Sequence, residues 1–242
     1  LGRISRAKNN LITPSTYQNN STYYSTDEAH RVPYTGQIYA TYMKRCKISG
    51  AMDFDDLLLN TNILLRDHKT VLEKYQQKFD YILVDEYQDT NFAQYLILKK
   101  LAEKHHNICV VGDDSQSIYA FRGAKIENIL NFQKDYPEMK VFKLEHNYRS
   151  TQNIVNAANS VIANNQKQLP KKVFTENVEG EKISIVRAIT EVEEGHLIAN
   201  SIQEKRLNEQ KKFSDFAILY RTNAQSRILE EALRKRNIPY RL

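Results

Sequence analysis

The sequence predicts an α/β fold in which parallel sheets are flanked by helices. From residue 79 onward, short aliphatic stretches alternate with longer segments of helical pattern. The aliphatic stretches are brief and continuous, which is typical of strands buried on both faces of a parallel sheet. Their alternation with helices indicates an α/β arrangement. The expected strands are 79–85, 107–112, 140–144, 182–186 and 215–220, and the expected helices are 91–104, 125–135, 151–165, 190–209 and 224–236.

The part before residue 79 is expected to be loop followed by helix. Residues 1–26 are rich in Asn, Ser and Thr and poor in aliphatic side chains, which predicts irregular structure. A helix is expected over 27–47, because acidic residues open this segment and basic residues close it. Gly50 breaks the chain, and 53–66 begins acidic and becomes apolar, as a second helix would. Much further on, the polar segment 164–181 is expected to be a surface excursion.

Length and charge favour one or two domains with a basic N-terminal part. The chain has 242 residues, 41% of them hydrophobic, and a net charge of +6. Residues 1–50 hold seven Lys and Arg against two acids, which is +5 of that total. Basic side chains interleaved with aromatic rings suit a nucleic-acid surface, and a solvated basic face with ordinary core tyrosines is the alternative. The tyrosines of this part are Tyr17, Tyr23, Tyr24, Tyr34, Tyr39 and Tyr42.

Targeting signals and disulfides are not indicated. No segment approaches the about 18 consecutive apolar residues that a membrane span needs. Residues 1–30 contain no apolar core of a signal peptide. Cys46 and Cys109 lie in unrelated contexts, so we expect both to be reduced thiols in the core. These features predict a cytoplasmic protein without a membrane partner.

The stretch "DYILVDEYQDTN", residues 80–91, delivers two adjacent carboxylates at the end of an apolar run. A sheet strand would hold Asp85 and Glu86 at its carboxyl end, where α/β proteins bind ligands. Adjacent acids repel each other, and a divalent cation is their natural partner. One carboxylate would hold Mg²⁺, and the other would orient a water for attack on phosphate. The alternative is a solvated acidic loop after a strand.

The stretch "CVVGDDSQSIYAFRGA", residues 109–124, repeats this arrangement. A short apolar strand ends in Gly112 and two aspartates, so polar groups from two strand ends would meet at one crevice. Tyr119 and Phe121 then alternate with small residues, which suits the stacking of nucleic-acid bases. The alternative places both rings in the core.

A third stretch, "LEHNYRSTQNIV", covers residues 144–155. Tyr148 and Arg149 precede Ser150 and Thr151, which we expect to cap a helix. An aromatic ring and an arginine at the start of a second α/β unit could pair with a base and a phosphate.

Together these stretches carry a family resemblance. "VDEYQDTN" (84–91), "VVGDDSQSIYAFRGA" (110–124) and "LEHNYRSTQNIV" (144–155) closely resemble, in order and spacing, motifs II, III and IV of superfamily 1 DNA helicases of the UvrD/PcrA/Rep type. "MDFDDLL" (52–58) and "AILYRTNAQSRILEEALRKRNIPYR" (217–241) extend the resemblance over nearly the whole chain. It implies a RecA-like fold, ATP hydrolysis with Mg²⁺, and 3′-to-5′ translocation on single-stranded DNA. The implied binding partners are single-stranded DNA and DNA duplex junctions.

The resemblance also implies roles for individual residues around ATP. Asp85 would hold Mg²⁺, and Glu86 would orient the hydrolytic water. Gln116 would sense the γ-phosphate and link it to the DNA path. Arg149 would act as an arginine finger across the domain cleft, and Tyr148 would stack on adenine.

Further residues are implied to contact DNA. The family usually carries Trp where this chain has Phe121, and the chain contains no Trp; this change is expected to weaken a stack without removing it. The family usually carries Phe where Tyr87 stands, which is expected to be neutral. The implied DNA-binding residues are Tyr119, Phe121, Arg122, Arg221, Asn223 and Arg227.

A phosphate-binding P-loop is absent. The pattern G-x-x-x-x-G-K-[ST] needs a Gly followed by Lys, and none of the seven glycines is. In the resembled family the P-loop lies upstream of these motifs, and motifs V and VI, with a second catalytic arginine, lie downstream. We therefore expect a central fragment that is inactive alone. It would comprise the C-terminal part of helical subdomain 1B (1–50), the latter part of RecA-like domain 1A (51–146) and the first part of RecA-like domain 2A (147–242).

Two other functions remain as alternatives. One is a non-catalytic nucleic-acid-binding module that kept the fold and lost ATPase activity. The intact set of Asp85, Glu86, Gln116 and Arg149 favours a helicase, since such a module has no need of it. The other is the helicase subunit of a helicase–nuclease complex, about which the sequence is silent. The sequence likewise leaves DNA repair and replication open.

Overall fold

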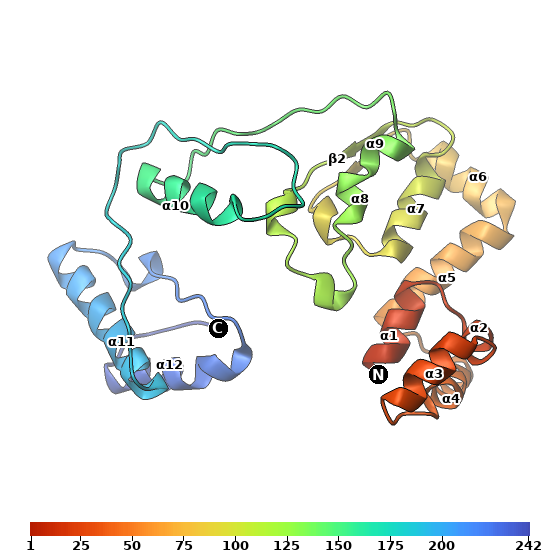
Figure 1. The fold of residues 1–242 in the computed structure, drawn as a ribbon, viewed down its shortest axis with the longest axis horizontal. Helices are drawn as coiled ribbons and strands as arrows, with labels where there is room; N and C mark the ends of the chain where they lie inside the picture. Colours follow the sequence, from red (N-terminus) through yellow and green to blue (C-terminus); the bar gives the residue numbers. More distant parts are fainter. The chain divides into compact units, whose positions relative to one another are not determined.

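A computed structural model describes residues 1–242, drawn as a ribbon in Figure 1. The chain is mostly helical and contains one small parallel sheet. It divides into two compact units, 1–178 and 179–242, which are described separately. The sequence-based boundary at 146/147 stays a prediction. None of the helices combines the length and the apolar character that a membrane-spanning segment requires.

The N-terminal part consists of helices joined by short turns, so the expected irregular structure over 1–26 is wrong. The helix expected over 27–47 is also interrupted, because residues 30–34 are not helical. The polar residues that suggested loops instead start helices. The side chain of Thr13 accepts a hydrogen bond from the Thr16 amide, with Pro14 in the first turn, and Asn20 caps the next helix. The helices are α1 (Gly2–Asn9), α2 (Pro14–Gln18), α3 (Ser21–Ala29) and α4 (Thr35–Ile48).

Tyrosines form the core of this helical part. Tyr39 is fully buried and meets the ring of Tyr17 edge to face at 6.1 Å between centroids. Tyr17 is also buried, and its hydroxyl donates to the Asp27 carboxylate at 2.9 Å. Tyr24 and Tyr34, in contrast, are exposed. The other two, Tyr23 and Tyr42, are half-buried against this core. Four of the six tyrosines thus follow the core interpretation, and two exposed rings remain for a nucleic-acid surface.

Helix α5 (Phe54–Asp67) confirms the helix expected there. It begins with a capping box in which Asp53 and Asp56 each accept from the other's backbone amide. The same two carboxylates meet Lys8 at 2.7 Å each, and the lysine side chain is fully buried. The N-terminal helices are therefore tied to α5 by a buried ion-pair network. Helix α6 (Lys69–Lys78), which the sequence did not predict, follows.

The sheet consists of β1 (Ile82–Val84) and β2 (Ile108–Val110), joined through helix α7 (Phe92–Ala102). The strands are parallel, and Leu83 lies opposite Cys109. Both central residues are exposed, so the sheet is not covered on both faces as expected. The expectation of a buried core thiol is accordingly wrong for Cys109, and Cys46 is half-buried.

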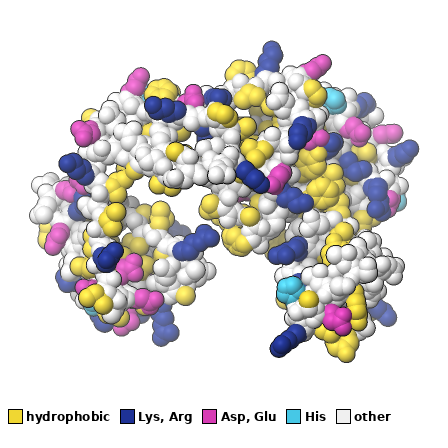
Figure 2. Space-filling model, viewed as in Figure 1, with side chains coloured by type: hydrophobic (Ala, Val, Ile, Leu, Met, Phe, Trp, Pro, Cys, Tyr) yellow, Lys and Arg dark blue, Asp and Glu magenta, His cyan; other side chains and the backbone are white.

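Three expected strands, 140–144, 182–186 and 215–220, are absent. A strand is stable only when its backbone bonds to a neighbouring strand, and these stretches have no such neighbour in the structure. Figure 2 shows hydrophobic side chains at many places on the surface. The exposed large hydrophobic side chains of the three stretches are Val141, Phe142, Leu144, Ile183, Ile185, Val186, Leu219 and Tyr220.

The helix expected over 125–135 is interrupted. It forms two short helices, α8 (Glu127–Leu130) and α9 (Phe132–Asp135), because Asn131 leaves the helical conformation. Helix α10 (Gln152–Ile162) follows close to its expected position. Short 3₁₀ helices surround the sheet: η1 (Tyr87–Asp89), η2 (Asp114–Gln116) and η3 (Ala120–Arg122).

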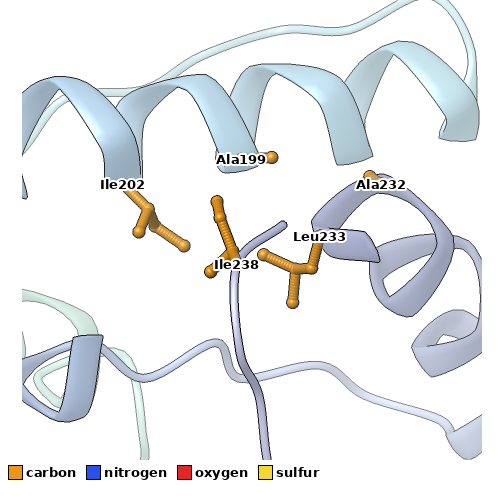
Figure 3. Close-up of a cluster of buried hydrophobic side chains, with 5 residues drawn as sticks. All are labelled: Ala199, Ile202, Ala232, Leu233 and Ile238. Atoms are coloured by element: carbon orange, nitrogen blue, oxygen red, sulfur yellow. The ribbon is translucent and has the colours of Figure 1, made fainter. Parts of the chain in front are cut away.

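The second unit is a helix pair with its own small core. Helices α11 (Glu191–Asn208) and α12 (Asn223–Lys235) confirm the helices expected there, and η4 (Phe213–Asp215) lies between them. Gly195 allows their close approach, because a Cβ added there would lie 3.0 Å from the Cβ of Ala232. Figure 3 shows the buried side chains that fill the interface: Ala199, Ile202, Ala232, Leu233 and Ile238.

Candidate functional site

Asp85 and Glu86 follow β1 directly and are both exposed. Their carboxylates are presented by an unusual turn, because Glu86 adopts a left-handed conformation with φ 50° and ψ 40°. Such a conformation is uncommon for a residue other than glycine, and it is found at functional sites. The turn is anchored by Tyr87, whose buried ring meets that of Phe132 at 5.5 Å. The two carboxylates therefore follow the strand directly and precede a tyrosine that is packed in the core.

The loop after β2 lies beside this turn, as the sequence predicted. The amide of Tyr87 donates to the carbonyl of Val111 at 3.0 Å, which joins the two strand ends. Gln116 is exposed, and its side-chain amide donates to Asp113 at 2.8 Å. A hollow of about 490 Å³ opens between the two loops; it is lined by Glu86, Gln88, Asp89, Ser115, Gln116, Ile118 and Tyr119.

The hollow contains the acidic side chains of Glu86 and Asp89. Asp89 is partly buried, and desolvation followed by repulsion from Glu86 raises the pKa of its carboxyl. Asp113 behaves oppositely: burial disfavours its charge, but hydrogen bonds from Lys171 and Gln116 hold its pKa below the usual range. The hollow is thus lined by the acidic side chains of Glu86 and Asp89, and the neutralised carboxylate of Asp113 bonds to Gln116 in its wall.

Lys171 supplies that neutralisation from the segment 164–181. Its ammonium group bonds to the carboxylates of Asp113 and Asp114, and Asp114 is buried. The carboxylate of Asp114 also accepts from the amide of Leu169 at 2.7 Å. This segment, expected to be only a surface excursion, is therefore fastened to the loop after β2.

Tyr119, Phe121 and Arg122 continue the same loop and form an exposed group. The two rings lie 5.9 Å apart, and the Arg122 guanidinium lies 5.0 and 5.5 Å from their centroids. Phe121 is 69% exposed and Tyr119 36%, so neither ring belongs to the core. Phe121 and Arg122 also line a larger hollow, of about 1410 Å³, together with residues of α1 such as Arg3 and Arg6.

Hydrogen bonds of two buried asparagines hold this loop in place. Asn128 donates to the carbonyl of Thr90 at 3.0 Å, and Asn91 pairs with Ala124 in an isolated bridge. The Asn91 side chain also donates to Asn9 of α1 at 2.9 Å. The two loops and α1 are thereby held together.

Tyr148 and Arg149 are not among the residues that line the hollow next to Glu86. Both are exposed, and the ring of Tyr148 lies against that of His146 at 4.0 Å. The expected cap by Ser150 and Thr151 does not form through their side chains. Asn147 instead stabilises the turn before the helix, since its side-chain oxygen accepts from the backbone amides of Arg149 and Ser150.

The remaining DNA candidates lie in the second unit. Arg221, Asn223 and Arg227 are exposed at the start of α12, where Asn223 is the first helical residue. The amide of Arg221 donates to the side chain of Gln225, which also caps the helix.

The donor set near β1 fits Mg²⁺ that is bound jointly with phosphate. No three His, Cys, Asp or Glu side chains converge to hold a metal by themselves. Mg²⁺ usually keeps several waters and is held by one or two carboxylates plus substrate phosphates. The exposed carboxylate of Asp85 at the strand end can serve as such a ligand; it lies next to Glu86 in the chain and is not itself among the residues that line the hollow.

Three residues near the hollow were missed by the sequence-based reasoning: Gln88, Asn91 and Lys171. Their partners lie 25, 82 and 58 positions away along the chain. For Gln88 and Asn91 the available signal was their position in "VDEYQDTN", directly after the two acids. For Lys171 we find no local signal.

Comparison with known proteins shows the family of the chain. Residues 2–137 match the UvrD/REP helicase N-terminal domain, and residues 142–242 match the UvrD-like helicase C-terminal domain. The chain belongs to the UvrD/REP helicase family.

Individual relatives agree with this assignment. The chain is 49% identical over 240 residues to the ATP-dependent DNA helicase PcrA of Leuconostoc citreum, covering 99% of this chain and 31% of that protein. It is 50% identical over 240 residues to PcrA of Staphylococcus aureus, covering 99% and 32%. It is 49% identical over 242 residues to PcrA of Bacillus subtilis, covering 100% and 32%. The chain thus spans about a third of the length of these relatives.

Proposed function

We propose that the chain is part of an ATP-dependent DNA helicase that translocates 3′ to 5′ on single-stranded DNA. One observation carries this proposal. The loop 113–122 lines the acidic hollow beside Glu86 with Gln116, and a few residues later presents Tyr119, Phe121 and Arg122 to the surface. A single rigidly supported loop therefore adjoins both a candidate phosphate site and a candidate base-stacking surface. A translocase needs such a connection, because hydrolysis must change the grip on DNA.

At the phosphate site, the proposed chemistry divides between the two acids. Mg²⁺, when bound with ATP, would neutralise phosphate charge, and Asp85 would hold it. Glu86 would accept a hydrogen bond from the attacking water and orient it towards the γ-phosphate. The exposure of both carboxylates is consistent with groups that meet a ligand, and not with groups that stabilise the core.

Gln116 would report the state of the γ-phosphate to the DNA-binding surface. Its side chain lines the hollow and bonds to Asp113, and the loop from there to Arg122 is short. A shift of Gln116 would therefore be passed along the loop to the rings of Tyr119 and Phe121. Arg149 as an arginine finger and Tyr148 as the adenine stack complete the nucleotide site in this proposal.

The sheet of β1 and β2, with its crossover helix α7, would belong to a RecA-like domain. In the same proposal Arg221, Asn223 and Arg227 contribute DNA contacts from the other half of the chain. The cell compartment would be the cytoplasm, and the process DNA repair or replication. A helicase subunit of a helicase–nuclease complex would use the same residues in the same way, so it stays an alternative.

The decisive experiment uses the full-length protein with Glu86→Gln. This change keeps the size of the side chain and removes the carboxylate that would orient the water. We expect ATP and single-strand binding to stay close to parental values while DNA-stimulated ATP turnover falls at least about 100-fold. A non-catalytic nucleic-acid-binding module would show no turnover to lose. A Glu86→Gln variant that unwinds DNA at the parental rate would exclude Glu86 as the catalytic carboxylate.

A further inference from the structure

Gln88 occupies a bridging position between the two loops of the hollow. Its side chain is almost fully buried, with 1% of the residue exposed. Its amide nitrogen donates to the carboxylate of Glu86 at 2.7 Å, and its amide oxygen accepts from the backbone amide of Asp113 at 3.0 Å. One side chain thus connects the end of β1 to the loop after β2.

The geometry leaves only one orientation of this amide. A backbone N–H can only donate, so the atom of Gln88 that faces Asp113 must be the oxygen. The NH₂ group is consequently directed to the Glu86 carboxylate, which can only accept when ionised. An ionised glutamate of the same length would offer only acceptors at these two ends.

Gly112 makes room for this arrangement. A Cβ added at Gly112 would lie 2.6 Å from the side-chain oxygen of Gln88 and 3.3 Å from its backbone nitrogen. Any residue other than glycine would therefore displace the amide from Asp113. The absence of a side chain at Gly112, after β2, therefore leaves the space that the side chain of Gln88 occupies.

The orientation of the Glu86 carboxylate has to be fixed by a neighbouring side chain. The backbone of Glu86 is in the left-handed conformation and its side chain is exposed, so nothing in the core fixes the carboxylate. The bond from Gln88 selects one carboxylate orientation. Because Asp113 in turn accepts from Gln116, Gln88 also joins Glu86 to the side chain on the opposite wall of the hollow.

We propose that Gln88 is a positioning residue, which aims the Glu86 carboxylate and couples it to the loop that carries Gln116. This inference rests on the proposed role of Glu86 as the group that orients the attacking water. A misplacement of about 1 Å at a reacting centre can lower a rate about 100-fold. Loss of this one hydrogen bond should therefore reduce turnover without greatly changing ATP binding.

The test compares Gln88→Glu with Glu86→Gln and with the swapped double variant in the full-length protein. Gln88→Glu keeps the acceptor for Asp113 but places a second carboxylate against Glu86. We expect its kcat for DNA-stimulated ATP hydrolysis to fall about tenfold or more, with KM for ATP changed less than about threefold. Its Tm should fall because two like charges face each other.

The swapped double variant distinguishes the effect of Gln88 on the position of Glu86 from its effect on folding stability. In Gln88→Glu with Glu86→Gln, the new amide at 86 can donate to the new carboxylate at 88. We expect the Tm to recover, while kcat stays at the level of Glu86→Gln alone, because residues that act as a unit are non-additive. Asn62→Leu is the matched control: it removes another buried amide, which donates to Ala93 outside the hollow. It should lower Tm and leave the kcat of the folded protein unchanged.

The outcomes distinguish the two proposals. If Glu86→Gln keeps parental turnover, the proposed function fails. If Glu86→Gln is inactive but Gln88→Glu loses less than about tenfold in kcat per folded molecule, or the swap restores no Tm, the positioning role is overturned. Should Gln88→Glu not fold, Gly112→Ala displaces the same amide from the other side and must show the same loss of kcat.

Discussion

Removal of the Phe121 ring separates a DNA-stacking role from a core role in one variant. We expect Phe121→Ala, in the full-length protein, to weaken single-strand binding several-fold and to impair translocation, with little change in folding stability. The ring is 69% exposed and has Arg122 near one face. A base approaching the exposed ring would complete a stack.

The magnitudes follow from burial. Truncation of a fully buried Phe lowers the free energy of unfolding by about 3–5 kcal/mol. Phe121 is about one-third buried, so roughly 1 kcal/mol is expected. Stacking of one base on an aromatic ring is worth about 1–3 kcal/mol, and a phenyl ring, which overlaps a base less than an indole does, should give the lower end. A loss of about 1 kcal/mol corresponds to about a fivefold weaker Kd.

The assay measures Tm and the Kd for a fluorescent single-stranded oligonucleotide on the same preparation. Phe142→Ala is the matched control, since Phe142 is 82% exposed and lines neither hollow. It should leave the Kd unchanged. A large fall in Tm of Phe121→Ala with an unchanged Kd of the folded fraction would refute the stacking role.

Four further outcomes are expected. Purified 1–242 should hydrolyse ATP far more slowly than about 1 s⁻¹ with single-stranded DNA present, because no glycine is followed by the P-loop lysine; turnover near that rate would contradict this. Lys8→Met should lower the free energy of unfolding by about 3–5 kcal/mol, because two aspartates lose their buried partner. Arg66→Ala, at an exposed pair, should barely move the Tm. The pKa of Asp113 is lowered in the folded protein, so the stability it contributes is present above the ordinary aspartate pKa, about 3.9, and is lost as pH falls through the lowered value. Asp113→Asn should flatten the fall of Tm with pH in that acid range, and an unaltered profile would exclude this contribution.

The sequence by itself determined the features that depend on neighbours along the chain. The apolar run before Asp85 ends where the strand must end, so the position of the two acids could be predicted. Asp53 and Asp56 form the capping box that an acidic helix start indicates, and α5 begins where expected. The family could likewise be inferred from the order and spacing of contiguous motifs, and the comparisons confirm it.

Prediction of secondary structure from the local sequence was wrong where a polar residue or an apolar run is compatible with two structures. Thr13 and Asn20 look like loop residues but cap helices, because the same side-chain oxygen serves a turn or a helix start equally well. The stretch 140–144 has strand composition but no partner strand, and hydrogen bonding to a partner is what makes a strand.

Only the tertiary structure decided which side chains support the acids. Gln88 meets Asp113 and Lys171 meets Asp113 and Asp114 across 25 and more than 50 positions of sequence, and no periodicity encodes such a meeting. Lys8 illustrates the same limit, since a lysine in a polar segment is expected in solvent and instead lies fully buried between two carboxylates. The residue types state which bonds are possible, and the packing of distant segments selects which of them form. That selection holds Glu86 in its unusual conformation beside Gln116.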